Sequence, residues 1–299
     1  MANSQVIVTV YRGRFAPSPT GPLHFGSLVA AVGSYLEAKF NGGEWLVRIE
    51  DLDPPRVVSG ASSEILTMLD RLGMEWDGEV IYQSRRKEIY QDALASLDQL
   101  GLIYPCFCSR KEIVDSSVVG ISGSIYPGTC RNNAPNRNKP GALRVKTNHN
   151  SIEFIDILNG SVCQRLRNDI GDFIIRRADG VYAYQLAVVV DDAAQNITHV
   201  VRGADLLDST PRQIYLQQLL GFITPVYMHL PLVINNSGEK LSKQTKAVPI
   251  DLSNAQSQLV AALQFLGQAP PTELMTSTIP SFWQWAIENW RSDKIPYPL

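Results

Sequence analysis

The 299-residue sequence lacks several features that would each point to a class of protein. No run of about 20 apolar residues occurs, so no membrane-spanning helix is predicted and we expect no membrane partner. The N-terminus shows no basic segment followed by an apolar one, so we expect no secretion signal and a cytoplasmic location. There is no internal repeat and no low-complexity tract, which excludes solenoids and linker-like chains.

A strong charge of either sign is also missing, since 27 Lys and Arg residues face 29 Asp and Glu residues. Any contact with a nucleic acid must therefore depend on local basic patches. Cysteine is scarce, and the four thiols of a chain in a reducing compartment are not expected to form disulfides. Three of them, Cys106, Cys108 and Cys130, are close in sequence. This clustering favours a metal site.

The pattern of apolar and polar residues predicts an α/β fold that opens with a βαβ unit. Residues 5–11 are predicted as a buried strand and 12–26 as a loop. Ser27 is expected to cap a helix that follows it, and residues 45–49 form the next strand. Nucleotide-binding sheets usually begin in this way. Further helices are predicted at 85–100 and 210–221, and further strands at 187–190 and 197–201.

Changes in composition divide the chain into four expected parts. Residues 1–104 and 181–245 are predicted as the two halves of a Rossmann-type parallel sheet. Residues 105–180 hold the clustered cysteines, a Ser- and Gly-rich loop at 116–124 and an Asn- and Pro-rich loop at 132–140, and are predicted as an inserted α+β subdomain. Residues 246–299 are expected to form a short helical region, with helices near 252–266 and 282–290.

The first motif that carries chemistry is RFAPSPTGPLHFGS over residues 14–27. Between a strand and a helix N-terminus, backbone N–H groups attract phosphate. His24 can hydrogen-bond phosphate oxygens from the first helical turn, and Gly26 leaves room for an adenosine beside the backbone. The alternative is a rigid turn of proline and glycine with Ser27 as a cap.

The second motif is KLSKQ over residues 240–244. Lys240 and Lys243 can close over a triphosphate and stabilise the charge that grows as pyrophosphate leaves. The alternative is a solvated basic loop.

Together the two motifs resemble the HIGH signature and the KMSKS loop of class I aminoacyl-tRNA synthetases, with Phe25 and Gln244 as departures. Residues 14–21, 48–53, 182–192 and 199–205 are similar to segments of the glutamyl- and glutaminyl-tRNA synthetases. The resemblance implies ATP as a substrate, with Mg²⁺ on its phosphates. It also implies catalytic roles for His24, Lys240 and Lys243, and ATP-binding roles for Pro17, His24, Gly26, Ser27 and Lys243.

Glutamate is the expected amino acid. A substrate carboxylate pairs well with a guanidinium group, and Arg14 and Arg202 are predicted at strand ends that face the ligand crevice. Arg14 could instead form a salt bridge with Glu50 or Asp51, and Tyr184 could be a core aromatic. Glutamyl enzymes often carry Asn where this chain has Val188. The resemblance implies that glutamate is bound by Arg14, Ser18, Glu50, Tyr184 and Arg202.

The region after the lysine loop is too short for a second sizeable core, so we expect no anticodon-binding domain. The whole-chain pattern is similar to short relatives of glutamyl-tRNA synthetase. That similarity implies that the substrate is L-glutamate and that it can be activated without tRNA. It also implies that the glutamate is esterified to queuosine in the anticodon of tRNA-Asp. We expect the protein to be a monomer. The alternatives are a truncated enzyme that charges a tRNA 3′ end, a non-catalytic zinc-containing RNA-binding paralogue, and another HIGH-type nucleotidyltransferase such as a pantothenate synthetase.

The cysteine cluster is predicted to hold one structural zinc ion, because thiolates bind zinc well and the metal would fasten an insertion too small for its own core. Three cysteines leave one position open, and the resemblance implies that Tyr126 fills it, beside Cys106, Cys108 and Cys130. His149 and Cys163 are the alternative fourth ligands, and three packed thiols without metal are the alternative to zinc. Cys163 lies in an alternating stretch and is expected in the core.

Overall fold

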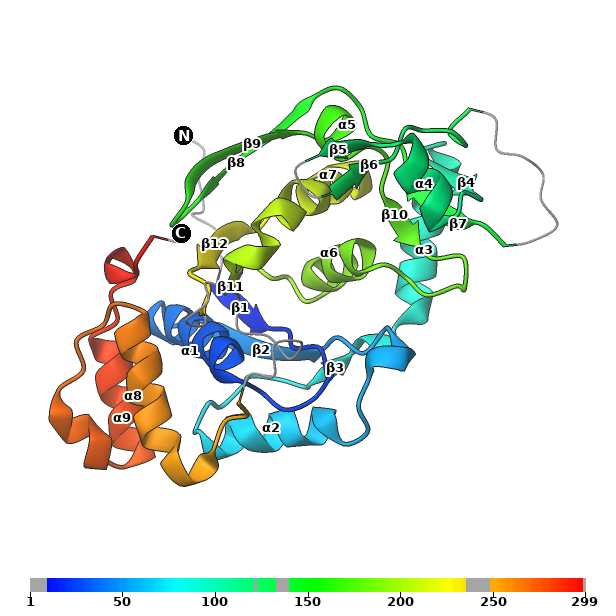
Figure 1. The fold of residues 1–299 in the computed structure, drawn as a ribbon. Coiled ribbons are helices and arrows are strands. Elements are labelled where there is room, and N and C mark those ends of the chain that lie inside the picture. The colour runs from blue at the N-terminus through cyan, green and yellow to red at the C-terminus, as the bar shows by residue number, and fades with distance from the viewer. Residues whose placement is uncertain (1–9, 121–122, 133–139, 235–247, 298–299) are drawn as a thin grey trace, which may run out of the picture.

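The computed structural model describes residues 10–120, 123–132, 140–234 and 248–297, and its centre is a parallel sheet built from two sets of strands (Figure 1). In the first set, parallel strands run in the order β1-β2-β3. In the second, the order is β11-β12-β8-β9, with all pairs parallel except the β8–β9 hairpin. The sets meet where the Thr198 N–H donates to the Arg12 carbonyl at 3.0 Å. These strands are β1 Arg12–Phe15, β2 Glu44–Ile49, β3 Ile81–Tyr82, β8 Ser151–Asp156, β9 Gly160–Arg165, β11 His199–Gly203 and β12 Val226–Leu230.

Helices pack around this sheet and share two apolar cores. One core surrounds α1 and the C-terminal helices, and the other surrounds α3, α6 and α7. Helix α1 approaches β12 so closely that a Cβ on Gly33 would lie 2.7 Å from Leu230 Cδ1, so any larger residue would have to displace the Leu230 side chain. The helices around the sheet are α1 Phe25–Phe40, α2 Ala61–Arg71, α3 Lys87–Gln99, α6 Tyr184–Ala194 and α7 Thr210–Leu220, with 3-10 turns at η1 Pro54–Arg56, η2 Gln83–Arg85 and η3 Ala204–Ser209.

The segment expected as an insertion holds an antiparallel sheet of order β10-β7-β4 and a small hairpin, β5–β6. The β8–β9 hairpin also comes from this segment, but it extends the central sheet at β12 instead. The expected boundaries at 104, 180 and 245 stay a prediction. The remaining elements here are β4 Ile103–Cys106, α4 Arg110–Ser116, β5 Val118–Gly120, β6 Gly123–Ile125, β7 Ala142–Val145, α5 Leu166–Asp169 and β10 Ile174–Arg176.

The C-terminal region packs against the first half of the sheet domain, as Figure 1 shows for α8 and α9 beside α1. Trp290 Nε1 donates to Glu37 Oε2 of α1 at 2.6 Å, and Trp283 Nε1 donates to the Leu72 carbonyl at 2.7 Å. The buried apolar residues described in this region belong to the same core as those of α1. Its elements are η5 Leu252–Asn254, α8 Ala255–Phe265, η6 Thr272–Thr276, α9 Ile279–Glu288 and η7 Ser292–Lys294.

Some sequence predictions are confirmed and others are wrong. The helix predicted at 210–221 is α7, which ends at Gly221 with φ +70°. Residues 187–190, predicted as a strand, lie in α6, where Leu186 to Asp192 are all buried. An apolar run buried on all sides has no period that separates strand from helix.

The beginning of the chain also differs from the prediction. Most of the strand predicted at 5–11 lies outside the described residues, and β1 begins only at Arg12, inside the expected loop. Helix α1 begins at Phe25 rather than after Ser27, because His24 is its N-cap. Among the described residues, no helix is both long and apolar enough to cross a membrane.

Candidate active site

The first motif forms the loop between β1 and α1, and its histidine closes the end of the helix. His24 Nδ1 accepts a hydrogen bond from the Ser27 backbone N–H at 3.3 Å, and Ser27 Oγ lies 3.2 Å from His24 Nε2. His24, Gly26 and Ser27 are all half-buried. The backbone N–H groups of the first turn of a 16-residue helix thus lie beside an imidazole, an arrangement that suits an anion.

The chain that follows the second motif returns to this helix end. Ile250 N–H donates to the Leu23 carbonyl at 3.0 Å, and His24 and Pro249 form an antiparallel bridge. Lys240 and Lys243 themselves lie outside the described residues. Residues 249 and 250, just beyond the second motif, thus lie against the end of the first motif through backbone contacts.

Arg14, in β1, is buried and held by a carboxylate from α6. Its Nε donates to Asp192 Oδ1 at 3.2 Å, and no hydrogen bond to another described residue occupies its Nη1 or Nη2. The same Asp192 oxygen lies 2.8 Å from Nη2 of the fully buried Arg48. Burial raises the pKa of Asp192, but the two arginines outweigh it and the pKa is lowered. The sequence left Glu50 or Asp51 as possible partners of Arg14, and the partner is Asp192.

Glu50 follows β2 directly and is an acceptor without a donor. Its Oε1 is buried and has no hydrogen-bond partner among the described residues; Arg48 Nη2 lies 3.5 Å away. Burial raises the pKa of Glu50 to about 7, although Arg48 and Arg14 oppose the shift. A buried carboxylate of this kind is suited to a cationic group such as an ammonium.

Arg202, in β11, is fixed on several sides. Its Nε donates to His229 Nε2 at 3.0 Å, its Nη2 donates to Thr210 Oγ1 at 2.8 Å, and its Nη1 donates to Tyr184 Oη at 3.3 Å. Burial raises the pKa of Tyr184, while Arg202 lowers it and Glu50 raises it further. Because the Nε and Nη2 atoms are engaged, Arg202 can offer a ligand mainly its Nη1 edge rather than the full fork that the sequence suggested.

The other candidate residues lie in the loop after β1 and in α6. Ser18 is exposed in the loop after β1, while Pro17 is buried and its carbonyl accepts from the Glu50 N–H at 3.0 Å. Val188 is buried in α6. The structure thus brings four of the five predicted glutamate ligands into one electrostatically coupled group, namely Arg14, Glu50, Tyr184 and Arg202.

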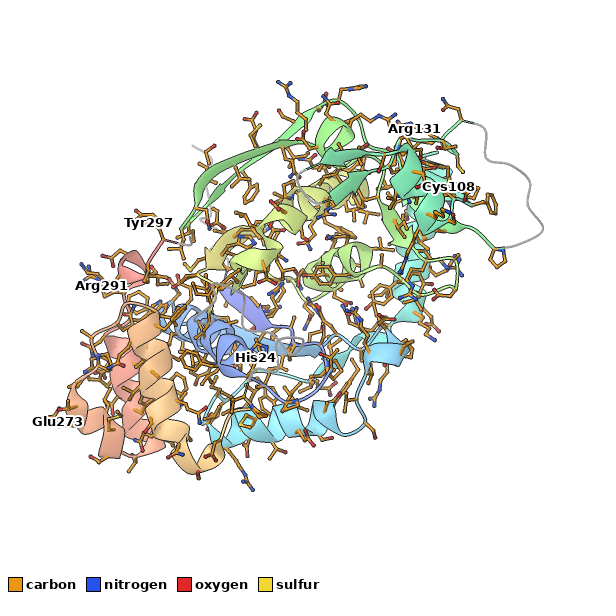
Figure 2. All side chains as sticks on the ribbon, in the orientation of Figure 1. His24, Cys108, Arg131, Glu273, Arg291 and Tyr297 are labelled. Carbon is orange, nitrogen blue, oxygen red and sulfur yellow. The ribbon has the colours of Figure 1, made fainter. Side chains whose placement is uncertain are left out.

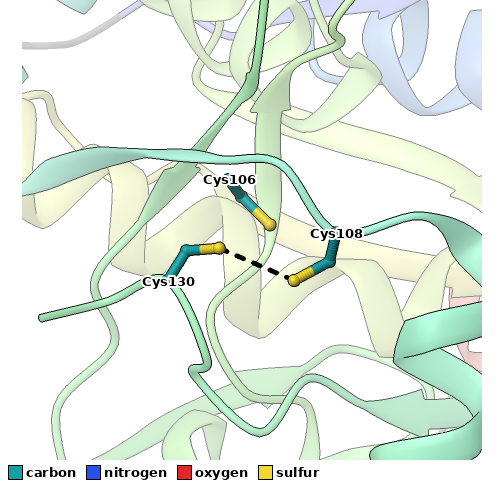
Figure 3. A group of neighbouring side chains, drawn as sticks. All are labelled: Cys106, Cys108 and Cys130. Atoms are coloured by element: carbon teal, nitrogen blue, oxygen red, sulfur yellow. Dashed lines mark hydrogen bonds between the residues drawn. The ribbon is translucent and has the colours of Figure 1, made fainter. Parts of the chain in front are cut away.

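The cysteine cluster lies elsewhere in the molecule. Figure 2 shows His24 near the middle and Cys108 toward the end where β4 and β7 lie. Figure 3 shows that the side chains of Cys106, Cys108 and Cys130 converge, and their sulfur atoms lie within 4.8 Å of one another. Burial raises the pKa of Cys108 to about 11. Burial also raises the pKa of Cys106, but Tyr126 and Arg144 outweigh it and the pKa is lowered.

Tyr126 completes this group. Its Oη lies 3.4 Å from Cys106 Sγ and 3.7 Å from Cys108 Sγ, and Cys108 Sγ lies 3.6 Å from Cys130 Sγ. Zinc–sulfur bonds of about 2.3 Å set tetrahedral ligand atoms about 3.8 Å apart, so the four side chains have the dimensions of a zinc site. Arg144 stacks on the Tyr126 ring at 3.8 Å.

Neither alternative fourth ligand joins the cysteine cluster. His149 is exposed and is not among the residues that could share a metal ion there. Cys163 is exposed in β9, which corrects its expected place in the core. The residues of β9 do alternate between two faces, but the buried face is the opposite of the predicted one, since Gln164 rather than Cys163 is buried.

Several residues of the site were not singled out from the sequence. Arg48 and Asp192 stood inside segments quoted only for their family resemblance, although a charged residue within a buried strand or helix signals a paired site. His229 in β12 and Asp156 in β8 gave no signal, because their pairing joins segments far apart in the chain.

Comparison with known proteins decides the family. Residues 10–267 match the family described as tRNA synthetases class I (E and Q), catalytic domain. The chain belongs to this class I synthetase family. It is therefore an enzyme of the ligase class, and the family chemistry implies ATP.

Relatives of full length place this class I synthetase more narrowly. It is 57% identical over 288 residues to the glutamyl-Q tRNA(Asp) synthetase of Dechloromonas aromatica (strain RCB), covering 96% of both chains. It is 51% identical over 289 residues to the enzyme of that name from Aromatoleum aromaticum (strain DSM 19018 / LMG 30748 / EbN1), covering 97% of this chain and 91% of the relative.

A solved structure shows the same fold. A glutamate tRNA ligase from Elizabethkingia meningosepticum CCUG26117, in complex with its amino acid, superposes with a TM-score of 0.79 at 25% identity. The superposition covers 97% of this synthetase and 66% of that chain. The class I α/β architecture with its parallel sheet is thus common to both proteins.

Proposed function

We propose that the protein activates L-glutamate with ATP and transfers the glutamyl group to queuosine in the anticodon of tRNA-Asp. The observation that carries the proposal is the charge pattern of one group of neighbouring side chains. Arg14 has two terminal nitrogens without a partner among the described residues, while Glu50 Oε1 is a buried acceptor without a donor. An amino acid with a second carboxylate supplies the matching groups, and the names of the two relatives agree with this choice.

In the first step, an oxygen of the α-carboxylate of glutamate attacks the α-phosphorus of ATP. The bond to the β-phosphate oxygen breaks, pyrophosphate leaves, and a mixed anhydride forms. His24 and the N-terminal turn of α1 would hold phosphate oxygens, with Lys240 and Lys243 on the pyrophosphate side and Mg²⁺ on the phosphates. Positioning and charge stabilisation account for most of the rate in such transfers.

In the second step, a hydroxyl of the queuosine cyclopentenediol attacks the carbonyl carbon of the anhydride. An ester bond forms while the bond between the carbonyl carbon and the phosphate oxygen breaks, so AMP leaves with that electron pair and the hydroxyl proton is released to solvent. Arg14, Glu50, Tyr184 and Arg202 would hold the glutamate during both steps, with Ser18 as a further hydroxyl contact. No side-chain nucleophile is required by this chemistry.

We also propose that Cys106, Cys108, Tyr126 and Cys130 hold one structural zinc ion. Its support is the spacing of the three sulfur atoms and the phenol oxygen. The site is remote from His24 in Figure 2, so the metal would fasten the loops around β4 rather than take part in either step.

Transfer of radiolabelled glutamate to total tRNA tests the proposed function. We expect label on tRNA-Asp, in the anticodon-containing fragment after nuclease digestion, and no label on tRNA from cells that cannot make queuosine. Removal of the 3′-terminal adenosine should leave the labelling intact. Label at the 3′ end of tRNA-Glu would instead show a short glutamyl-tRNA synthetase. The absence of glutamate-dependent pyrophosphate exchange, with or without tRNA, would leave an RNA-binding paralogue.

A further inference from the structure

The guanidinium group of Arg202 is attached to a buried histidine and carboxylate that the proposed reaction does not use. His229 Nδ1 lies 2.6 Å from Asp156 Oδ2, and His229 Nε2 accepts from Arg202 Nε at 3.0 Å. All three side chains are buried, with His229 at 0% and Asp156 at 1% exposure. We propose that Asp156 and His229 are positioning residues that fix the tautomer of one imidazole and thereby the orientation of Arg202 for substrate recognition.

The direction of each hydrogen bond follows from the chemistry of Arg202. Its Nε always carries a hydrogen, because arginine stays protonated in proteins. His229 Nε2 must therefore present a lone pair, and the single proton of the neutral imidazole must lie on Nδ1. That proton points to Asp156. Burial lowers the pKa of His229, and its hydrogen bond to Asp156 does not offset this effect, which agrees with a neutral ring.

Asp156 is itself fixed at the end of β8. Its Oδ1 accepts from the backbone N–H of Leu158 at 3.1 Å and of Asn159 at 2.9 Å, and from Asn159 Nδ2 at 2.7 Å. These donors leave Oδ2 for His229. Burial raises the pKa of Asp156, but hydrogen bonds from His229 and Asn159 outweigh it and lower the pKa to about 2. The Asp156 carboxylate is thus ionised at neutral pH and can only accept hydrogen bonds.

The tautomer of His229 affects the candidate glutamate-binding residues through the orientation of Arg202. With Nε on His229 and Nη2 on Thr210, the guanidinium plane is fixed and Nη1 points to Tyr184. An acidic substrate would meet this Nη1 edge. This role rests on the proposed function, since it assigns Arg202 to the substrate, but the tautomer of His229 can be measured without any substrate.

Asp156→Asn is the decisive change. The backbone N–H groups of Leu158 and Asn159 require an acceptor, so the amide oxygen must take the Oδ1 position and the NH₂ group must face His229. The imidazole proton then moves to Nε2, where it can donate to Thr210 Oγ1, 3.1 Å away, but displaces the hydrogen bond from Arg202 Nε. In serine proteases, the Asp-to-Asn change at the catalytic triad leaves the histidine in the wrong tautomer and severely impairs catalysis.

We expect Asp156→Asn to raise the glutamate KM of ATP–pyrophosphate exchange about tenfold or more, with kcat and the ATP KM within about twofold. The size of the change is taken by analogy with residues that orient metal ligands, whose loss changes metal affinity by about 10- to 100-fold. Asp293→Asn, at an exposed C-terminal carboxylate paired with Arg291, is the matched control and should change none of the three. Equal glutamate KM values for the wild type and Asp156→Asn would overturn the proposal.

Substitutions of His229, alone and combined with Asp156→Asn, distinguish a relay from Asp156 through His229 to Arg202 from a general loss of structure. In His229→Gln the side-chain oxygen can accept from Arg202 without help from Asp156, whereas His229→Met offers no such acceptor. The glutamate KM should therefore rise in His229→Met and much less in His229→Gln. Adding Asp156→Asn to His229→Gln should change the KM by less than about twofold, since the imidazole is gone. A full further increase would show that Asp156 does not act through His229.

Histidine ¹⁵N spectroscopy gives a readout independent of activity. The wild type should show protonated Nδ1 at His229, and Asp156→Asn should show protonated Nε2. If the wild type lacks glutamate-dependent exchange, the proposed function fails and this spectrum alone judges the relay. An unchanged tautomer in Asp156→Asn overturns the relay in either case.

Discussion

One oxygen of Asp192 serves two arginines, since Asp192 Oδ1 lies 2.8 Å from Arg48 Nη2 and accepts from Arg14 Nε at 3.2 Å. Arg48 is completely buried, and Arg14 and Asp192 are nearly so. A single carboxylate in α6 thereby connects β1, which carries Arg14, with β2, which carries Arg48 and is followed by Glu50. The position of the candidate glutamate-binding side chains and the packing of α6 on the sheet share this contact.

Asp192→Ala should therefore destabilise the protein strongly. Removing one partner of a buried ion pair typically costs about 3–5 kcal/mol, because the remaining charge stays buried without compensation. Chemical denaturation monitored by circular dichroism measures the change in the free energy of unfolding. Asp179→Ala breaks an exposed pair with Arg177 and is the control, with an expected change below about 1 kcal/mol. Equal free energies of unfolding for the two variants would contradict a stabilising role of Asp192 between Arg14 and Arg48.

The raised pKa of Glu50, about 7, predicts a pH-dependent affinity for glutamate. The ionised carboxylate binds an ammonium group, and its population falls about tenfold between pH 8 and pH 6 for such a pKa. The glutamate KM should rise by about this factor as the pH falls, while the ATP KM stays nearly constant. Glu50→Gln should show a high KM that no longer changes over this interval. A flat profile in the wild type would remove Glu50 from ammonium binding.

The same shift affects stability with a defined sign. Between its ordinary pKa and about 7, the folded protein keeps a proton on Glu50 that the unfolded chain has released. The contribution of Glu50 to the free energy of unfolding is therefore greatest at low pH and is lost as the pH rises toward 7.

Metal analysis tests the cysteine cluster. Protein expressed with sufficient zinc should contain about one equivalent by elemental mass spectrometry, and Cys108→Ser should lose most of it. Cys163→Ser changes an exposed cysteine of β9 and should retain the full content. Less than about a tenth of an equivalent in the wild type would rule out a tight structural site.

The C-terminal region should contribute strongly to stability through Trp290. Its ring is 1% exposed and its Nε1 donates to Glu37 in α1. Trp290→Ala should lower the free energy of unfolding by about 3–5 kcal/mol, as large-to-small core substitutions do. Tyr297→Ala, at a residue 82% exposed, should change it by no more than about 0.5 kcal/mol. Comparable values for both would show that the region is not part of the core.

Lys243→Ala should reduce glutamate-dependent pyrophosphate exchange by about 100-fold or more while leaving the melting temperature unchanged, because lost electrostatic stabilisation acts on the transition state. Lys294→Ala removes a lysine of the C-terminal region and serves as the control. Unchanged exchange in Lys243→Ala would exclude the lysine loop from the mechanism.

Local chemistry made much of this fold predictable. Pro211 at the start of α7 and Gly221 at its end are strong helix signals, and both are where the structure places them. The three clustered cysteines were also recognisable, because their spacing is a local property of the sequence. The strand predicted at 187–190 is wrong, because the helical state of this run is set by burial on every side.

The candidate site was only partly predictable for a related reason. Arg14 and Arg202 were found from motifs that resemble a known family, but their partners were not. Asp192 and His229 are set by tertiary contacts between segments that no spacing rule connects. His24 as a helix cap was missed because Ser and Thr are the usual caps.

The pairing of β8 with β12 limits which segments of this enzyme can be exchanged in chimeric proteins. A chimera that exchanged residues 105–180 for the equivalent stretch of another synthetase would appear to alter only peripheral loops. It would also replace Asp156, which lies in that stretch, pairs with β12 through β8 and contacts His229. Grafts intended to change acceptor preference should therefore keep β8 and its turn in place, and treat the hairpin as native to the host.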